Sequence, residues 1–333
     1  MSRVAIVCPG RGSYTEATLR SLPPEHEFVQ AAEKLRADYG LESLLALDGA
    51  PRFEPARHLR PAHVSALIYT ASMIDAQKVW ADHEVVCVLG NSMGWYTSLA
   101  VAGSLSFEDG FHLVQRMALW QETGVAGGQL IYPLVNEDWQ PVPERKAAAL
   151  AAIAAHPGQL FLSIDLGGYL VLAGSDAGLA AARKALPPVQ QGGVPYPLRL
   201  AQHGPYHTPL AQGVSDAAVA DLSGLPMALP RAPMIDGTGR CWSPWSSDLE
   251  ALRRYTLVDQ VIKPYDLRAG IAVAIKEFAP ERLMLLGPGN TLGGITGQVL
   301  LAETWKGLKT RDDFRAHQAG PDAMVVSMGL ARA

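Results

Sequence analysis

Glu84-Val-Val-Cys-Val-Leu-Gly-Asn-Ser-Met-Gly94 gives the clearest indication of the fold in this 333-residue sequence. Its first part is rich in valine and carries no charge after Glu84, which is typical of a strand buried on both faces. Two glycines, Gly90 and Gly94, then bracket a sharp turn. The apolar pattern that follows predicts a helix over residues 95–102. A buried strand that passes directly into a helix indicates an α/β fold with a parallel sheet.

The segments on either side of this stretch continue the alternation of strands and helices. The sequence predicts strands at residues 4–8 and 282–286, and helices at residues 64–80, 107–122 and 265–278. Pro9-Gly10 ends the first strand, and the loop Gly287-Pro-Gly-Asn290 follows the last one. We therefore expect a large α/β subdomain built from residues 1–124 and 204–333.

The middle of the chain follows a different pattern. Four predicted strands alternate with two predicted helices: strands at 129–135, 160–164, 169–173 and 196–200, and helices at 144–155 and 176–186. The order strand-helix-strand-strand-helix-strand is the ferredoxin-like pattern. We therefore expect residues 125–203 to form a small ferredoxin-like subdomain inserted into the large one.

Composition and charge exclude several classes of protein. Hydrophobic residues make up 48% of the chain and charged residues 18%, as in ordinary globular proteins. The formal net charge is -4 and no basic block is present, so we expect no nucleic-acid partner. The apolar stretches are shorter than the roughly 20 residues of a membrane span, and no secretory signal is visible. Three widely spaced cysteines, two of them in predicted buried strands, indicate reduced thiols. These features predict a cytoplasmic protein.

Ser92 is the candidate nucleophile. Gly90-Asn91-Ser92-Met93-Gly94 fits the pattern G-x-S-x-G, and the strand before it and the helix after it supply the context of a nucleophile elbow. That context makes the large subdomain α/β-hydrolase-like. The flanking glycines allow the strained backbone that projects a serine hydroxyl. The Met93 amide lies at the predicted helix N-terminus, where a developing oxyanion is stabilised.

The serine needs a base to accept its proton, and two of the nine histidines stand out. His203 and His207 lie in His203-Gly-Pro-Tyr-His207, directly after the last strand of the inserted segment. Their spacing of four could suggest a metal pair. Gly204-Pro205 prevents the helix that would align them, and no thiol or carboxylate nearby completes a site, so we predict no metal. From spacing alone, either histidine could be the base.

Five segments together resemble the malonyl-CoA:acyl-carrier-protein transacylase family, which includes the acyltransferase domains of fatty-acid and polyketide synthesis. They occur in the family's order along most of the chain. The segments are Cys8-Pro-Gly-Arg-Gly-Ser13 for P-G-Q-G-S, Gly90–Gly94 for G-H-S-x-G, Leu113–Gln121 for L-V-x-x-R-G-x-x-M-Q, Gly204–Leu210 for x-x-F-H-S-P-L, and Gly287–Asn290 for G-P-G-x.

The resemblance implies a role for several residues. His207 matches the family's base, and Arg116 matches the arginine that holds the free carboxylate of a malonyl group; a planar guanidinium can grip a carboxylate with two parallel hydrogen bonds. Tyr206 and Met93 match residues that crowd a methyl branch, which favours malonyl over methylmalonyl. The backbone amide of Arg11 would complete the oxyanion hole with that of Met93.

The chain departs from the family at some of these positions. Arg11 replaces a glutamine and adds a positive charge, and Asn91 replaces the histidine before the nucleophile, where it would line the substrate site. The amide residue that orients the histidine is replaced by Asp266. Asp266 would make a Ser-His-Asp triad, or it would only cap the helix that follows it.

By this resemblance the chain is an acyl-carrier-protein S-malonyltransferase that uses malonyl-CoA as substrate and binds no cofactor. Its partner would be an acyl carrier protein that presents a phosphopantetheine thiol. Two alternatives use the same residues. One is an editing hydrolase that removes acyl groups from carrier proteins, which a full triad would suit. The other is the malonyl transacylase subunit of a malonate decarboxylase.

Overall fold

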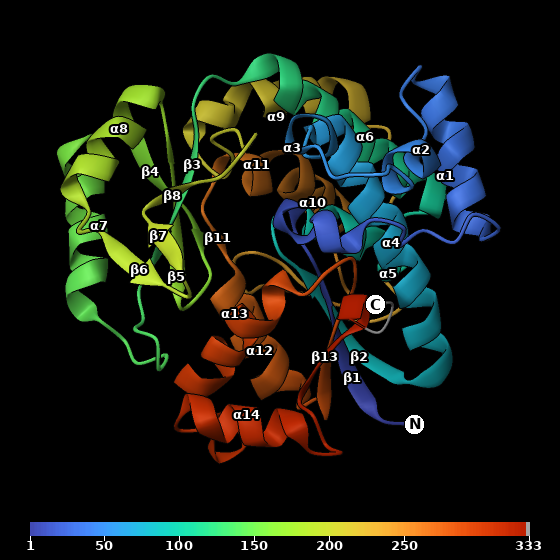
Figure 1. Ribbon diagram of the computed structural model, residues 1–333. Coiled ribbons are helices and arrows are strands. Elements are labelled where there is room, and N and C mark those ends of the chain that lie inside the picture. Colours follow the sequence, from blue (N-terminus) through green and yellow to red (C-terminus); the bar gives the residue numbers. More distant parts are fainter. Residues whose placement is uncertain (331–333) are drawn as a thin grey trace.

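The computed structural model describes residues 1–330, and its largest element is the predicted parallel sheet (Figure 1). Residues 84–94 form strand β2 and the turn after it, and β2 pairs in parallel with β1. The sheet has the order β10-β9-β2-β1-β12-β13 and is parallel except at the β10–β9 edge. Its strands are β1 (Arg3–Cys8), β2 (Glu84–Gly90), β9 (Met234–Ile235), β10 (Cys241–Trp242), β12 (Arg282–Leu285) and β13 (Val325–Ser327).

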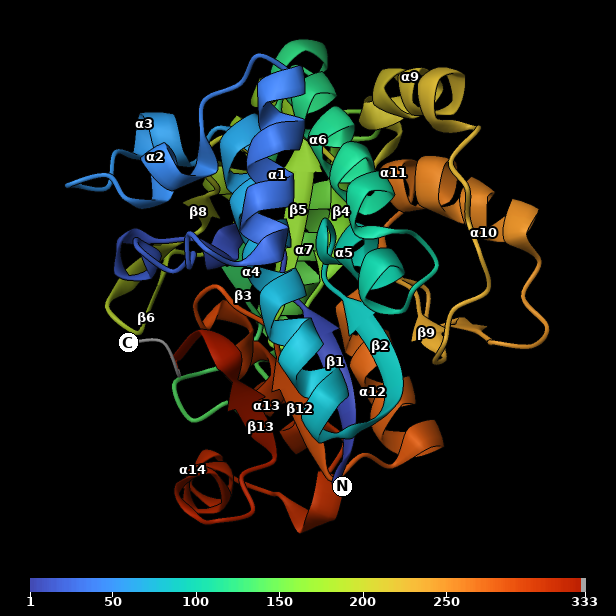
Figure 2. The same cartoon turned by 90° about the vertical axis from the view of Figure 1, so that its right-hand side faces the viewer.

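Helices cover both faces of this sheet. Figures 1 and 2 show α4 (Pro61–Asp82) and α5 (Gly94–Val101) on one face, and α12 (Leu267–Phe278) and α13 (Thr291–Ala302) on the other. α4 is buried along most of its length because its apolar residues surround the whole helix rather than one stripe. The elements therefore form three layers, helices on both faces of the sheet, and the predicted α/β fold with a parallel sheet is confirmed.

The remaining helices surround this core. α6 (Phe107–Gly124) packs on α4, and Ser106 caps its N-terminus by accepting a hydrogen bond from the Asp109 amide. The others are α1 (Glu27–Asp38), α2 (Leu44–Asp48), α3 (Pro55–His58), α9 (Gln212–Leu222), α10 (Leu249–Arg254), α11 (Gln260–Ile262) and α14 (Arg311–Ala319). Single turns of 3₁₀-helix occur at Arg11–Ser13, Glu16–Thr18, Pro209–Ala211, Trp305–Gly307 and Met328–Leu330.

The inserted segment carries a second sheet and a hydrophobic cluster of its own. Its elements are β3 (Gly128–Pro133), α7 (Pro143–Ala155), β4 (Leu160–Asp165), β5 (Tyr169–Gly174), α8 (Asp176–Ala185) and β8 (Leu198–Arg199). The strands have the order β11-β4-β5-β3-β8, where β11 (Tyr265–Asp266) comes from the large part of the chain and pairs in parallel with β4. Leu130, Tyr132, Leu172 and Leu179 are buried in the cluster between this sheet and its two helices. We therefore propose the division into residues 125–203 and the remainder.

One predicted strand of this segment is interrupted. The sequence predicts a single strand over residues 196–200. In the structure β7 (Val194–Tyr196) pairs with β6 (Val189–Gln191) in a hairpin and ends at Tyr196, and β8 begins at Leu198. Pro197 lies between them and has no N–H to donate to a ladder, so it separates the two strands.

No helix among residues 1–330 has the length and apolar character that crossing a membrane requires.

Candidate active site

The nucleophile elbow has the strained backbone that the glycine pattern predicts. Ser92 has φ +55°, a conformation that non-glycine residues rarely adopt. The chain approaches itself closely on both sides of it. A Cβ on Gly94 would lie 2.2 Å from the Cys8 carbonyl oxygen, and one on Gly90 would lie 2.3 Å from the Gly94 carbonyl. The two glycines therefore allow β1, β2 and α5 to meet beneath Ser92.

The structure brings His207 to Ser92. The Ser92 hydroxyl oxygen lies 2.8 Å from His207 Nε2, a hydrogen bond between residues 115 positions apart. The His207 side chain is fully buried, and its backbone also adopts a positive φ of +61°. Of the two histidines that the sequence left open, only His207 makes this contact; His203 Nδ1 lies 2.8 Å from the Ala201 carbonyl oxygen instead.

A backbone carbonyl, not Asp266, orients His207. His207 Nδ1 donates to the Gln260 carbonyl oxygen at 2.6 Å, and the His207 amide donates to the Val261 carbonyl at 2.8 Å. Both carbonyls belong to the last turn of a helix, where carbonyls have no partner within the helix. The negative end of that helix also favours a positively charged imidazole. The Gln260 carbonyl and the end of the helix therefore orient His207 and stabilise its positive charge, the two roles of a triad carboxylate.

Asp266 has the second of its two predicted roles, that of a helix cap. Its carboxylate accepts a hydrogen bond from the Ala269 amide at 2.7 Å and one from Arg268 at 3.0 Å, so it caps the start of α12. The prediction of a Ser-His-Asp triad is therefore wrong. The sequence could not distinguish the two roles because an aspartate before a helix suits both.

Gln260 is a site residue that the sequence analysis missed. Besides its carbonyl contact to His207, its side chain donates to the Ser92 carbonyl at 3.0 Å and accepts from the Tyr96 hydroxyl at 2.7 Å. It directly follows a turn of π-helix, Tyr255–Asp259, a distortion that occurs often at functional sites. Because its contact with His207 uses the main chain, no residue type in the sequence could mark it.

Two backbone amides are free to bind an oxyanion. Met93 N–H and Arg11 N–H have no acceptor among residues 1–330, and both residues line the cleft that contains Ser92. Met93 immediately precedes α5, whose positive end points toward the cleft floor. The geometry is therefore compatible with the oxyanion hole that was predicted from these two amides.

Burial is the main cause that lowers the pKa of His207, to about 4. The Gln260 carbonyl acts to raise this pKa, and the positive charge of Arg11 lowers it further. His207 is therefore neutral near pH 7, with Nε2 able to accept the Ser92 proton.

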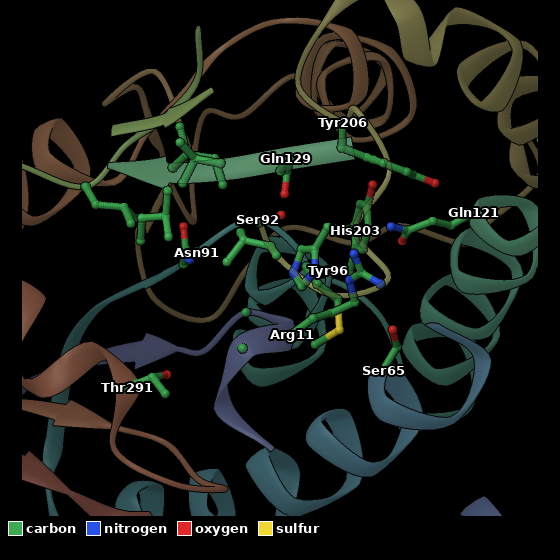
Figure 3. A pocket seen from close by; sticks show the side chains of 18 of the residues that line it. Arg11, Ser65, Asn91, Ser92, Tyr96, Gln121, Gln129, His203, Tyr206 and Thr291 are labelled. Atoms are coloured by element: carbon green, nitrogen blue, oxygen red, sulfur yellow. The ribbon is translucent and has the colours of Figure 1, made fainter. Parts of the chain in front are cut away.

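Ser92 lies in a cleft between the two sheets, shown in Figure 3. The empty space, including the open mouth, is about 1040 Å³. Tyr206 and Asn91, predicted to contact substrate, both line it. Most of the other walls are apolar: Met93, Val114, Met117, Ala118, Ile131, Ile164, Leu166, Val171, Leu200, Leu292 and Ile295.

Arg116 does not point into this cleft, which corrects the prediction that it clamps a carboxylate there. Its Nε atom lies 2.6 Å from a carboxylate oxygen of Asp221 on α9, and its guanidinium stacks on Trp120. The cleft is lined by Val114, Met117, Ala118 and Gln121, one face of α6, and Arg116 lies about 100° away from Met117 around the helix.

A shift of one residue in the alignment with the family motif explains why Arg116 was predicted to line the cleft. The resembling segment Leu113–Gln121 is nine residues long, whereas the family motif spans ten positions. A register counted from Leu113-Val114 places Met117 at the arginine position, and Met117 does line the cleft.

No group of three or more potential metal ligands is found among residues 1–330.

No family model matches the chain. Over 90% of its length, however, it is similar to curated malonyl CoA-acyl carrier protein transacylases. The protein of Haemophilus influenzae is 24% identical over 313 residues, which cover 93% of that protein. The protein of Bacillus subtilis is 22% identical over 308 residues, which cover 91% of it. The resemblance seen in the sequence is confirmed.

Solved structures share the fold. The acyl-carrier-protein S-malonyltransferase of Burkholderia pseudomallei is 22% identical, with a TM-score of 0.72 over 89% of this chain and 93% of that one. The malonyl-CoA:ACP transacylase of Synechocystis is 15% identical, with a TM-score of 0.75 over 99% and 97%. A malonyl-transacylase in complex with its type II polyketide synthase acyl-carrier protein is 22% identical, with a TM-score of 0.72 over 90% and 93%.

Proposed function

We propose that this protein transfers a malonyl group from malonyl-CoA to the phosphopantetheine thiol of an acyl carrier protein, through an ester on Ser92. The observation that carries the proposal is the 2.8 Å contact between the Ser92 hydroxyl and His207 at an elbow in the floor of the cleft. We propose malonyl as the acyl group because the relatives are named malonyl transacylases, and an acyl carrier protein as the acceptor because one of them was solved in complex with its acyl-carrier protein.

The first half-reaction forms the acyl-enzyme. His207 Nε2 accepts the Ser92 proton as the serine oxygen attacks the thioester carbonyl, and the Gln260 carbonyl stabilises the imidazolium that results. The Met93 and Arg11 amides bind the oxyanion. When the intermediate collapses, the carbon–sulfur bond breaks, and His207 returns the proton to the departing CoA thiolate.

The second half-reaction runs in the opposite direction with a different thiol. The phosphopantetheine thiol gives its proton to His207 and attacks the Ser92 ester, and the serine oxygen leaves and recovers that proton. No metal or bound cofactor takes part in this scheme. CoA thioesters are intracellular metabolites, so the compartment that we propose is the cytoplasm.

The two alternatives differ from this scheme only in the acceptor. An editing hydrolase would use water. A full triad was the feature that favoured it, and among residues 1–330 His207 Nδ1 donates to the Gln260 carbonyl instead of to a carboxylate. A malonate decarboxylase subunit would use the thiol of a different carrier. We propose the acyl carrier protein as acceptor because the relatives that span the whole chain are named for it.

The test is to load the enzyme with malonyl-CoA, remove free CoA ester, and add a holo acyl carrier protein. We expect the malonyl group to appear on the carrier protein much faster than free malonate appears without it. The matched control is the apo carrier protein, which lacks the thiol. Release of malonate at the same rate with and without holo carrier would contradict the proposal in favour of the hydrolase.

A further inference from the structure

We propose that the side chain of Arg11 holds the free carboxylate of the acyl group in this cleft, the role that the resemblance assigned to Arg116. This inference rests on the proposed function and names the residue that would select a malonyl group.

Arg11 follows β1 in the turn Arg11–Ser13 and extends into the cleft beside the nucleophile. Figure 3 shows its side chain between Ser92 and Gln121. Nη1 donates to the Gln202 carbonyl oxygen at 3.1 Å. No ion pair of Arg11 with a carboxylate is found among residues 1–330, although a guanidinium carries several donors. Arg11 therefore keeps donors available for an anionic ligand.

A second polar group faces the same part of the cleft. The side-chain nitrogen of Gln121 on α6 is buried and has no hydrogen-bond partner among the described residues. A buried donor without a partner costs free energy unless a ligand supplies an acceptor. Arg11 donates to the Gln202 carbonyl, and a Cβ on Gly204 would lie 3.6 Å from the Gln121 side-chain nitrogen. Both donors therefore lie beside the same short segment of the cleft wall, where one carboxylate can accept from both.

The position of Arg11 in the chain also suits the size of a malonyl group. The Arg11 amide is one of the two proposed oxyanion donors, so the reacting carbonyl lies beside its main chain. The malonyl carboxylate is separated from that carbonyl by only two carbon–carbon bonds of about 1.5 Å each. A side chain that starts at the oxyanion hole and folds over the cleft is therefore close enough to reach it.

The electrostatics of the cleft agree with an anionic ligand. Burial lowers the pKa of Arg11 to about 10, so its guanidinium stays charged at neutral pH. His203 beside it is neutral at this pH and does not compete for an anionic ligand, because burial and then the charge of Arg11 lower the His203 pKa to about 3. A charge in a largely apolar cleft is stabilised by an ion partner. A malonyl group supplies that partner, whereas an acetyl group leaves the charge unpaired.

The experiment compares acylation of Ser92 by malonyl-CoA and acetyl-CoA in wild type, Arg11→Gln and Arg116→Gln, with intact mass read at short times. Arg11→Gln keeps the main-chain amide and removes the charge. We expect it to slow malonyl loading by about 100-fold or more, while acetyl loading is unchanged or faster. Arg116→Gln is the matched control, the same substitution outside the cleft, and should load malonyl at close to the wild-type rate.

Three results would overturn the inference. Malonyl loading of Arg11→Gln at the wild-type rate would remove any role for the charge, and equal losses with both esters would assign Arg11 to the reaction centre rather than to the carboxylate. Selective loss of malonyl loading in Arg116→Gln would show that Arg116, not Arg11, binds the malonyl carboxylate. A wild-type protein that takes no malonyl group at all would instead overturn the proposed function, so the two failures are distinguishable.

Discussion

Replacement of His207 by alanine should slow the acylation of Ser92 by about 10²–10⁴-fold, because the serine loses the base 2.8 Å from its hydroxyl. The measurement is the rate at which the malonyl adduct appears by rapid quench and intact mass. Asp266→Asn is the control. Its side chain caps α12 and does not contact His207, so we expect an acylation rate near that of wild type. A large loss in Asp266→Asn with little loss in His207→Ala would contradict the site described here.

The pH profile of the wild type gives an independent check on the same histidine. The base must be neutral to accept the proton, and its pKa is lowered to about 4. The rate of acylation should therefore be flat from about pH 8 to pH 6 and fall only as the pH approaches 4, because protonation then removes the base. A limb centred at or above the ordinary histidine pKa of about 6.5 would contradict the buried environment.

Replacement of Gly94 by alanine should destabilise the fold by about 3 kcal/mol or more. The added methyl would lie 2.2 Å from the Cys8 carbonyl oxygen and 2.9 Å from that of Pro9, both of which are main-chain atoms. The strand and the helix would have to separate under Ser92. Chemical denaturation measures the change as a shift of the unfolding midpoint.

Gly213→Ala is the matched control for this prediction. Gly213 lies in α9, and an added Cβ there would meet nothing within 4 Å. Alanine in an open helical position should be neutral or stabilise the protein by about 0.5–1 kcal/mol. Equal midpoints for Gly94→Ala and wild type would mean that the close packing beneath the elbow is not as described.

The elbow and the layers of the fold could be predicted because local residue types determine them. Gly90 and Gly94 mark the turn, since no other residue fits where the main chains meet. The central strands and long helices are apolar over enough residues to show a period. Strands such as β9 and β10 span two residues each, and pairing with their neighbours in space, not local pattern, makes them strands.

The partners of the nucleophile were predictable only in part. The sequence limited the base to two candidates, His203 and His207, and the resemblance to the family favoured His207. The orienting group could not be found, because a main-chain carbonyl of Gln260 is invisible in a sequence, whereas Asp266 is a visible carboxylate in a plausible place. Arg116 was assigned to the cleft because the alignment with the family motif was shifted by one residue. One residue along a helix changes the direction of the side chain by about 100°, and Arg116 therefore points away from the cleft and pairs with Asp221.

Peptide mapping of the protein after brief exposure to malonyl-CoA shows directly whether Ser92 is the nucleophile. We expect one malonyl group per chain, located on the peptide that contains Ser92, and none on Ser92→Ala treated in the same way. A malonyl group that persists on Ser92→Ala, or that maps to any other residue of the wild type, would contradict it.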